Sequence, residues 1–220
     1  MKMLRVVVLL TGALSAGSVL ADAPDGATMA RQGNGHGAAP CAACHGADGA
    51  GQSVAGYPRL AGLPPAYLRK QLDDFANGSR ANAVMQPISR ALNETEREAI
   101  ARYFGNLPVP APASTTPPDG DVAALGRKLA TRGRWPDSLP ACDQCHAPGG
   151  IGVGDHFPPL AGQSRAYLVN ALRAWKQGAR RNDPLQLMQH VVAQLNDRDI
   201  EAIGTWYASQ PMTQPQEPQP

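Results

Sequence analysis

The sequence predicts an all-α protein built from two similar halves. Apolar residues recur at helical spacing in several segments, and no segment shows the alternation of a half-buried strand. The block Tyr57 to Gly62 recurs as Phe157 to Gly162, 100 positions later. The pattern Cys-x-x-Cys-His occurs once in each half, at residues 41–45 and 142–146. A repeat with this period indicates a tandem duplication of one small helical unit.

Capping and breaking residues place the longest helices. In the first half we expect a helix that begins at Pro64-Pro65 and ends at Gly78, because proline suits a first turn and glycine a C-terminal cap. Its counterpart is expected over residues 167–177, with Ser164 as the N-cap.

The last helix of each half follows an asparagine. We expect one helix after Asn93, ending before Pro108, and its partner after Asn196, ending near Gln210. A third kind of helix, at about residues 122–131, precedes the second cysteine motif. The approach to the first motif shows no clear long helix.

Composition divides the chain into five segments. Residues 1–21 have Lys2 and Arg5, an apolar run and small residues, which is typical of a secretory signal peptide, with a retained membrane anchor as the alternative. We expect a first domain at 22–107, a proline-rich linker at 108–120 and a second domain at 121–210. Residues 211–220 are rich in proline and glutamine and are predicted to be disordered.

All four cysteines of the chain lie in the two motifs. Cysteines two residues apart can each form a thioether to one haem vinyl group, and the adjacent histidine becomes the proximal iron ligand. A zinc site does not explain the histidine after each pair, four cysteines are few for a disulfide framework, and a thioredoxin-like pair needs a βαβ context. The sequence therefore predicts two haem c groups, attached through Cys41, Cys44, Cys142 and Cys145 with His45 and His146 as proximal ligands.

The sixth iron position separates an electron carrier from an enzyme, because a second protein ligand closes the iron to small molecules. Met85 and Met188 stand in matched sequence contexts, 40 and 42 positions after their histidines. A thioether ligand suits a haem of fairly high potential, so both are predicted axial ligands. For the second haem, His190 and His156 remain alternatives.

The charge of the chain favours a protein partner over a nucleic acid. The signal segment carries two of the 20 Lys and Arg residues and none of the 18 Asp and Glu residues, which leaves a formally neutral mature chain. Nucleic-acid binding favours a clustered basic face instead.

The paired motifs, the Pro-x-Leu-Ala-Gly blocks, the Ala-Tyr-Leu helices and the two methionine blocks resemble the dihaem class I cytochromes of the cytochrome c4 type. The resemblance implies two cytochrome c folds joined by the linker and related by a pseudo-two-fold axis. It further implies a periplasmic role in which electrons are delivered to a terminal oxidase or reductase. The backbone carbonyls of Pro58 and Pro158 would then accept a hydrogen bond from the proximal imidazoles.

The predicted function is therefore that of a periplasmic, monomeric electron carrier and not an enzyme. Its partners would be a redox protein donor and acceptor, such as a cytochrome complex, a terminal oxidase or a dehydrogenase, through which it would associate loosely with the membrane. One alternative is the electron-accepting subunit of a periplasmic dehydrogenase. A dihaem peroxidase or thiosulfate dehydrogenase is a weaker alternative, because matched methionine ligands leave no open iron.

Overall fold

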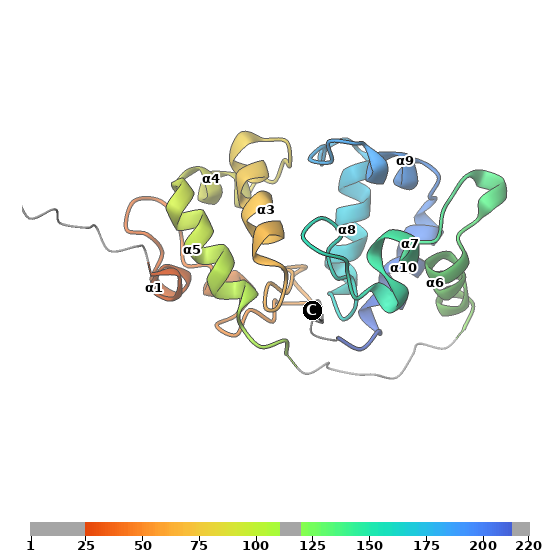
Figure 1. Ribbon diagram of the computed structural model, residues 1–220, viewed down its shortest axis with the longest axis horizontal. Helices are drawn as coiled ribbons and strands as arrows, with labels where there is room; N and C mark the ends of the chain where they lie inside the picture. Colours follow the sequence, from red (N-terminus) through yellow and green to blue (C-terminus); the bar gives the residue numbers. More distant parts are fainter. Residues whose placement is uncertain (1–24, 111–119, 213–220) are drawn as a thin grey trace, which may run out of the picture.

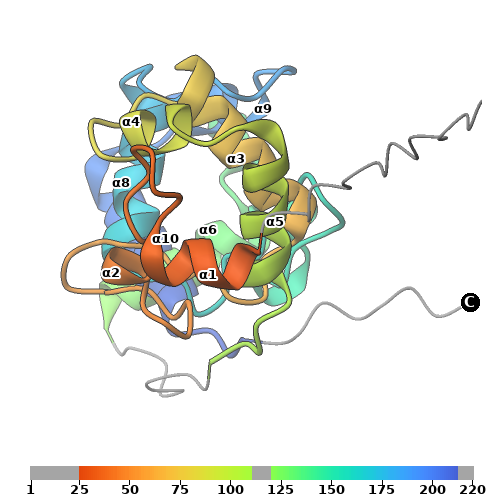
Figure 2. The same cartoon turned by 90° about the vertical axis from the view of Figure 1, so that its left-hand side faces the viewer.

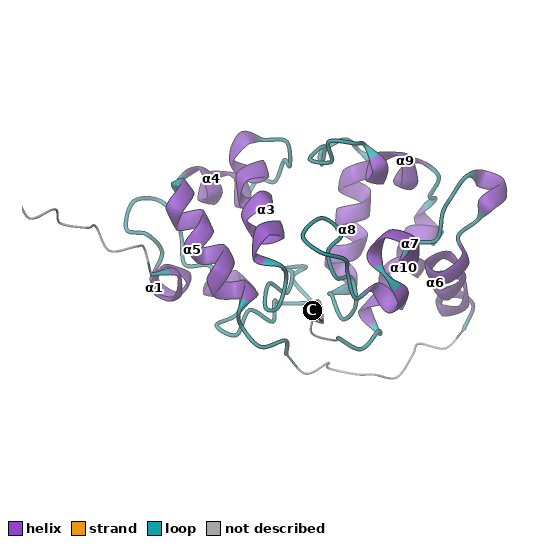
Figure 3. Ribbon diagram, in the orientation of Figure 1, coloured by secondary structure: helices purple, strands orange, loops and turns teal. Residues whose placement is uncertain are grey.

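A computed structural model describes residues 25–110 and 120–212 of the 220-residue chain. Within these residues the regular structure is helical, and pairing between extended segments is limited to isolated bridges (Figure 3). The predicted all-α class is confirmed. The predicted signal segment, residues 111–119 of the predicted linker and residues 213–220 of the predicted tail lie outside the described residues.

The two halves lie side by side along the long axis of the molecule (Figure 1). The first contains α1 (Gly26–Gln32), α2 (Ala42–His45), α3 (Pro65–Asn77), α4 (Met85–Arg90) and α5 (Glu94–Gly105). The second contains α6 (Asp121–Arg132), α7 (Asp143–His146), α8 (Arg165–Lys176), α9 (Leu187–Ala193) and α10 (Asp197–Ala208), with short 3-10 turns at Trp135–Asp137 and Pro148–Gly150.

The helices expected from capping residues are confirmed. Gly78 ends α3 in the left-handed conformation, and the Ser164 hydroxyl accepts a hydrogen bond from the α8 backbone. Asn93 and Asn196 form complete capping boxes at the starts of α5 and α10. The sequence did not predict α1, α4 and α9. These helices have only six or seven residues, and α4 and α9 begin without a side-chain cap.

Each half is closed by a tight crossing between its first and last helix. A Cβ atom on Gly26 in α1 would lie 2.3 Å from the carbonyl oxygen of Ala99 in α5. A Cβ on Gly126 in α6 would lie 2.2 Å from the corresponding oxygen of Ala202 in α10. Because both distances are far below van der Waals contact, the crossings require glycine. In Figure 2, α1 lies below α4, and α5 runs along one side of the first half between them.

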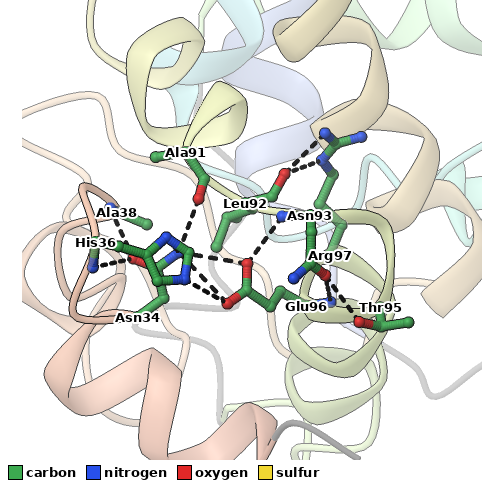
Figure 4. A network of polar contacts seen from close by, with 9 residues as sticks. All are labelled: Asn34, His36, Ala38, Ala91, Leu92, Asn93, Thr95, Glu96 and Arg97. Atoms are coloured by element: carbon green, nitrogen blue, oxygen red, sulfur yellow. Dashed lines mark hydrogen bonds and ion pairs between the residues drawn. The ribbon is translucent and has the colours of Figure 1, made fainter.

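The loop that leads to the first cysteine motif is tied to the start of α5 (Figure 4). The Asn34 amide donates to the carbonyl oxygen of Ala91 at 2.8 Å, and His36 Nε2 lies 3.1 Å from Glu96 Oε1. In the second half, Arg134 makes both the contact to a carboxylate and the contact to a backbone carbonyl. Its guanidinium donates to the carboxylate of Asp199 and to a carbonyl oxygen, each at 3.0 Å. Different side chains thus hold equivalent loops.

A seam of direct hydrogen bonds joins the halves. Backbone bonds run from Ala81 N to Ala179 O (2.8 Å) and from Arg181 N to Ser79 O (2.7 Å). These two bonds are equivalent under the 100-residue repeat, so the pairing has the symmetry of the duplication.

Arginine and tyrosine side chains extend the seam. Arg80 lies over the Phe75 ring and donates to the Tyr167 hydroxyl at 3.0 Å. Arg180 lies over the Trp175 ring and donates to the Tyr67 hydroxyl at 3.3 Å. The two arginines therefore bind the opposite half in matched ways.

Other seam contacts have no counterpart. Gln71 Oε1 accepts hydrogen bonds from Arg80, Arg180 and Asn182 at 2.8–3.1 Å, whereas alanine occupies position 171. The buried Arg59 guanidinium donates to carbonyl oxygens of both halves, and burial lowers the pKa of Arg59 to about 10. The seam is thus symmetric in its backbone and asymmetric in several side chains.

Candidate haem centres

Each Cys-x-x-Cys-His motif forms one helical turn, α2 or α7, that ends at its histidine. The His45 backbone NH donates to Cys41 O at 2.9 Å, and the His146 NH donates to Cys142 O at 3.0 Å. This turn brings both cysteines and the histidine of a motif to one place. Each of these helices has only four residues, and its histidine is buried.

A backbone carbonyl orients each motif histidine. His45 Nδ1 lies 2.9 Å from Pro58 O, and His146 Nδ1 lies 2.9 Å from Pro158 O. A carbonyl oxygen can only accept, so Nδ1 carries the proton and Nε2 keeps a free lone pair. Burial lowers the pKa of both imidazoles and outweighs the opposing effect of these hydrogen bonds. Neutral imidazole with a free Nε2 is the form that binds iron.

The motif cysteines are free thiols that do not pair with one another. Burial raises the pKa of the Cys41 thiol to about 11 and that of Cys142 to about 12. Such thiols stay protonated at neutral pH, whereas metal ligation by cysteine needs the thiolate. Among the residues described, no three His, Cys, Asp or Glu side chains gather in an arrangement that could hold a metal ion.

The second motif has an additional support. The buried Tyr207 hydroxyl donates to the Asp143 carboxylate at 2.6 Å, and this carboxylate also accepts from the Gly149 backbone NH at 3.2 Å. In the first half, Ala42 and Phe104 occupy the corresponding positions. The sequence pattern did not identify this contact, because Tyr207 fits the apolar side of its helix.

The second half encloses a cavity of about 520 Å³. Its lining is largely apolar and includes Cys142, Cys145, His146 and Met188. Leu63, Tyr67, Lys70 and Gln71 of the first half also line it, so the cavity reaches the seam. The predicted attachment and ligand residues of the second centre are therefore neighbours around one space.

The two candidate methionines occupy equivalent places at the starts of α4 and α9. The Met85 NH donates to Asn82 Oδ1 at 2.8 Å, and the Met188 NH donates to Asp183 Oδ2 at 2.6 Å. Met188 packs against the apolar core of the second half, and Ile88, one turn after Met85, packs against that of the first. An acceptor side chain thus fixes the backbone of each methionine.

The two alternative histidines differ in their surroundings. His190 is exposed, its Nδ1 lies 2.6 Å from Gln186 O, and it does not line the cavity. His156 lies at the cavity and is exposed. Met188 is the half-buried member of the three and lies with His146 in the lining.

Known proteins resemble this chain in sequence and in fold. Residues 28–104 match the family model described as cytochrome c oxidase, cbb3-type, subunit III. The thiosulfate dehydrogenase electron acceptor of Stutzerimonas stutzeri is 45% identical over 87% of this chain and 89% of its own length. Cytochrome c4 of Pseudomonas aeruginosa is 35% identical over 77% of this chain and 83% of its own length. The chain belongs to the cytochrome c4 family.

A solved structure shares the fold of this chain. Thiosulfate dehydrogenase (TsdBA) from Marichromatium purpuratum superimposes with a TM-score of 0.78 at 44% identity. The match covers 85% of this chain and 40% of that one. The chain is therefore an electron-transfer protein with two haem c groups, as its motifs predict.

The residues of the second centre fit a haem. The cavity has the size of a small-molecule site, an apolar body and two thiols beside a histidine with a free Nε2. Its polar lining, which includes Tyr167, Arg180 and Asn182, lies at the seam and suits the two haem carboxylates.

No helix in residues 25–110 and 120–212 is long and apolar enough for a membrane crossing.

Proposed function

We propose that this chain is a periplasmic electron carrier that accepts electrons from a thiosulfate-oxidising dehydrogenase. The observation that carries the proposal is the similarity to a thiosulfate dehydrogenase electron acceptor over 87% of the chain. The identity to this relative is 45%, against 35% for the cytochrome c4 of Pseudomonas aeruginosa. The proposal makes the chain an acceptor and carrier, with no substrate chemistry of its own.

In this proposal residues 22–107 and 121–210 are two cytochrome c domains with one haem each. Cys41 and Cys44 hold the first haem and Cys142 and Cys145 the second. His45 with Met85, and His146 with Met188, are the axial ligand pairs. Each haem supplies an iron that alternates between the ferric and ferrous states.

The protein residues have two tasks in electron transfer. Pro58 and Pro158 hold the imidazoles in the tautomer that presents Nε2 to the iron. Asn82 and Asp183 fix the backbones from which the methionines extend. A histidine and a methionine that together hold each iron would leave no position for peroxide or oxygen, which favours electron transfer.

The ligand proposal is tested by the weak methionine-to-iron charge-transfer band of the oxidised holoprotein. We expect the full intensity of two haems in the wild type. Met85→Ala and Met188→Ala should each remove half of it, with both haems still attached. Met212→Ala is a control that should leave the band unchanged. Half intensity in the wild type would contradict closure of both irons by methionine.

The partner proposal is tested by rapid mixing of the oxidised cytochrome with a thiosulfate dehydrogenase and thiosulfate. We expect reduction of both haems at a rate that falls as salt is added, as for a transient complex guided by charge. Absence of reduction with the dehydrogenase, together with fast electron delivery to a terminal oxidase, would favour the second candidate function. That candidate is a respiratory carrier, and the similarity to proteins named cytochrome c4 supports it.

A further inference from the structure

Among residues 25–110 and 120–212, the seam carries an ion pair on one side only. Lys70 and Asp74 lie one turn apart in α3, with Lys70 Nζ 2.5 Å from Asp74 Oδ2. The equivalent positions of α8 hold Asn170 and Ala174. The pair is therefore a feature of the first half that the duplication does not repeat.

The pair binds the second half. Lys70 Nζ donates to the carbonyl oxygen of Asn182 at 2.8 Å, and Asn182 Nδ2 donates to Asp74 Oδ2 at 2.6 Å. Asn182 is buried, and the Asp74 side chain is 10% exposed against 37% for Lys70. The ammonium and the carboxylate are thus held in place by a residue of the other half.

The pair stands at the cavity of the second haem. Lys70 and Asn182 line that cavity, which also contains His146 and Met188 in its wall. Asp74 stands directly behind them through its bonds to both. The Arg180 cation also lines the cavity, but Arg80 repeats it in the first half, so the arginines do not distinguish the two centres.

We propose that the charges of Lys70 and Asp74, two residues of the first half, set the reduction potential of the second haem. Lys70 raises this potential and Asp74 lowers it. The inference rests on a haem in the cavity lined by His146 and Met188. It is independent of which dehydrogenase or oxidase serves as partner.

The signs follow from electrostatics. Reduction lowers the charge of the iron by one unit, so a nearby cation favours the reduced form and a nearby anion disfavours it. The buried carboxylate is shielded less than the half-exposed ammonium. At an effective dielectric near 20, one unit charge removed at about 15 Å from a redox centre changes the oxidised-to-reduced equilibrium by about sixfold. A tenfold change corresponds to about 59 mV for one electron.

The test is a redox titration of the holoprotein followed by NMR, which resolves the methyl signals of each haem. Lys70→Met should lower the potential of the second haem and Asp74→Asn should raise it, while the first haem moves less. Lys70→Arg keeps the charge and should restore the wild-type value. The double variant Lys70→Asn with Asp74→Ala copies the second half and should give a smaller shift than either single charge removal, because the two effects oppose each other.

Asn170→Met, at the position equivalent to Lys70, is the matched control and should leave both potentials unchanged. Raising the ionic strength should shrink the Lys70→Met shift. Shifts of the same sign in the two charge variants, equal shifts at both haems, or unchanged potentials would each overturn the inference. Loss of the methionine band in Lys70→Met would overturn it too, because the residue would then act on coordination. An absent second-haem signal in the wild type would instead reject the underlying haem assignment.

Discussion

At equivalent positions in the two halves, a carboxylate near the start of the last helix binds different partners in the loop before the cysteine motif. Burial raises the pKa of Asp199, but hydrogen bonds from Arg134 and from the Asn196 backbone outweigh this and hold it below its ordinary value. Glu96 fills the equivalent place in the first half, with His36 and Asn34 as its partners. A depressed carboxyl pKa stabilises the folded state above the ordinary Asp pKa and loses that effect as the pH falls through the folded value.

Arg134→Met should therefore lower the free energy of unfolding at pH 7 by about 2 kcal/mol, because a buried carboxylate loses its cation. The gap between variant and wild type should narrow as the pH falls below the ordinary Asp pKa and should close once Asp199 itself is protonated, because its folded pKa lies below that ordinary value. Thermal unfolding of the holoprotein across this pH range measures both effects. Arg132→Met, an exposed neighbour, is the control. A gap independent of pH would contradict the role of Asp199.

The sequence identified the residues with strong local patterns. The cysteine motifs and the repeated methionine blocks predicted the groups that gather at the second cavity, and the family resemblance predicted the Pro58 and Pro158 contacts. The hydroxyl groups of Tyr67 and Tyr167 were missed, because both residues fit an apolar helix side while their hydroxyls meet arginines of the other half. Long-range polar contacts of this kind have no periodicity in sequence.

Among the helices, those that begin with a capping side chain could be predicted from the sequence, whereas short helices that depend on tertiary packing could not. The capping boxes at Asn93 and Asn196 fixed the starts of α5 and α10 to the residue. In contrast, α4 and α9 start without a side-chain cap, and acceptors outside the helix, Asn82 and Asp183, bind their first turns. Short helices of this kind depend on tertiary contacts more than on intrinsic propensity.

Gly126→Ala should separate α6 from α10. The added methyl group would lie 2.2 Å from Ala202 O and 2.8 Å from Trp206 Cβ, so one helix must shift. We expect a loss of about 1–3 kcal/mol in unfolding free energy, despite the better helix propensity of alanine. Denaturant unfolding followed by the haem absorption of the second half measures it. A variant as stable as the wild type would show that the crossing tolerates a side chain.

For the whole molecule, the seam determines whether the halves unfold together. Gln71 is buried and accepts three hydrogen bonds from residues on both sides. Its replacement leaves buried donors without an acceptor, which costs about 1–3 kcal/mol for such a group.

We expect one thermal transition for the wild type and two transitions, one for each half, for Gln71→Leu. Calorimetry of the holoprotein measures this, and Gln177→Leu, an exposed position at the end of α8, is the control. A single transition at an unchanged temperature would mean that the backbone and arginine contacts suffice to couple the halves.

The two backbone bonds of the seam have the symmetry of a dimer, although several side chains around them do not. Ala81 N to Ala179 O and Arg181 N to Ser79 O form an isologous contact, the kind that two identical subunits make across a dimer axis. In a dimer of identical subunits every substitution appears twice, so both centres keep the same surroundings. Joining the subunits in one polypeptide lets lysine stand at position 70 and asparagine at 170. A fused pair can thus give a passing electron a preferred direction, which a symmetric dimer cannot do.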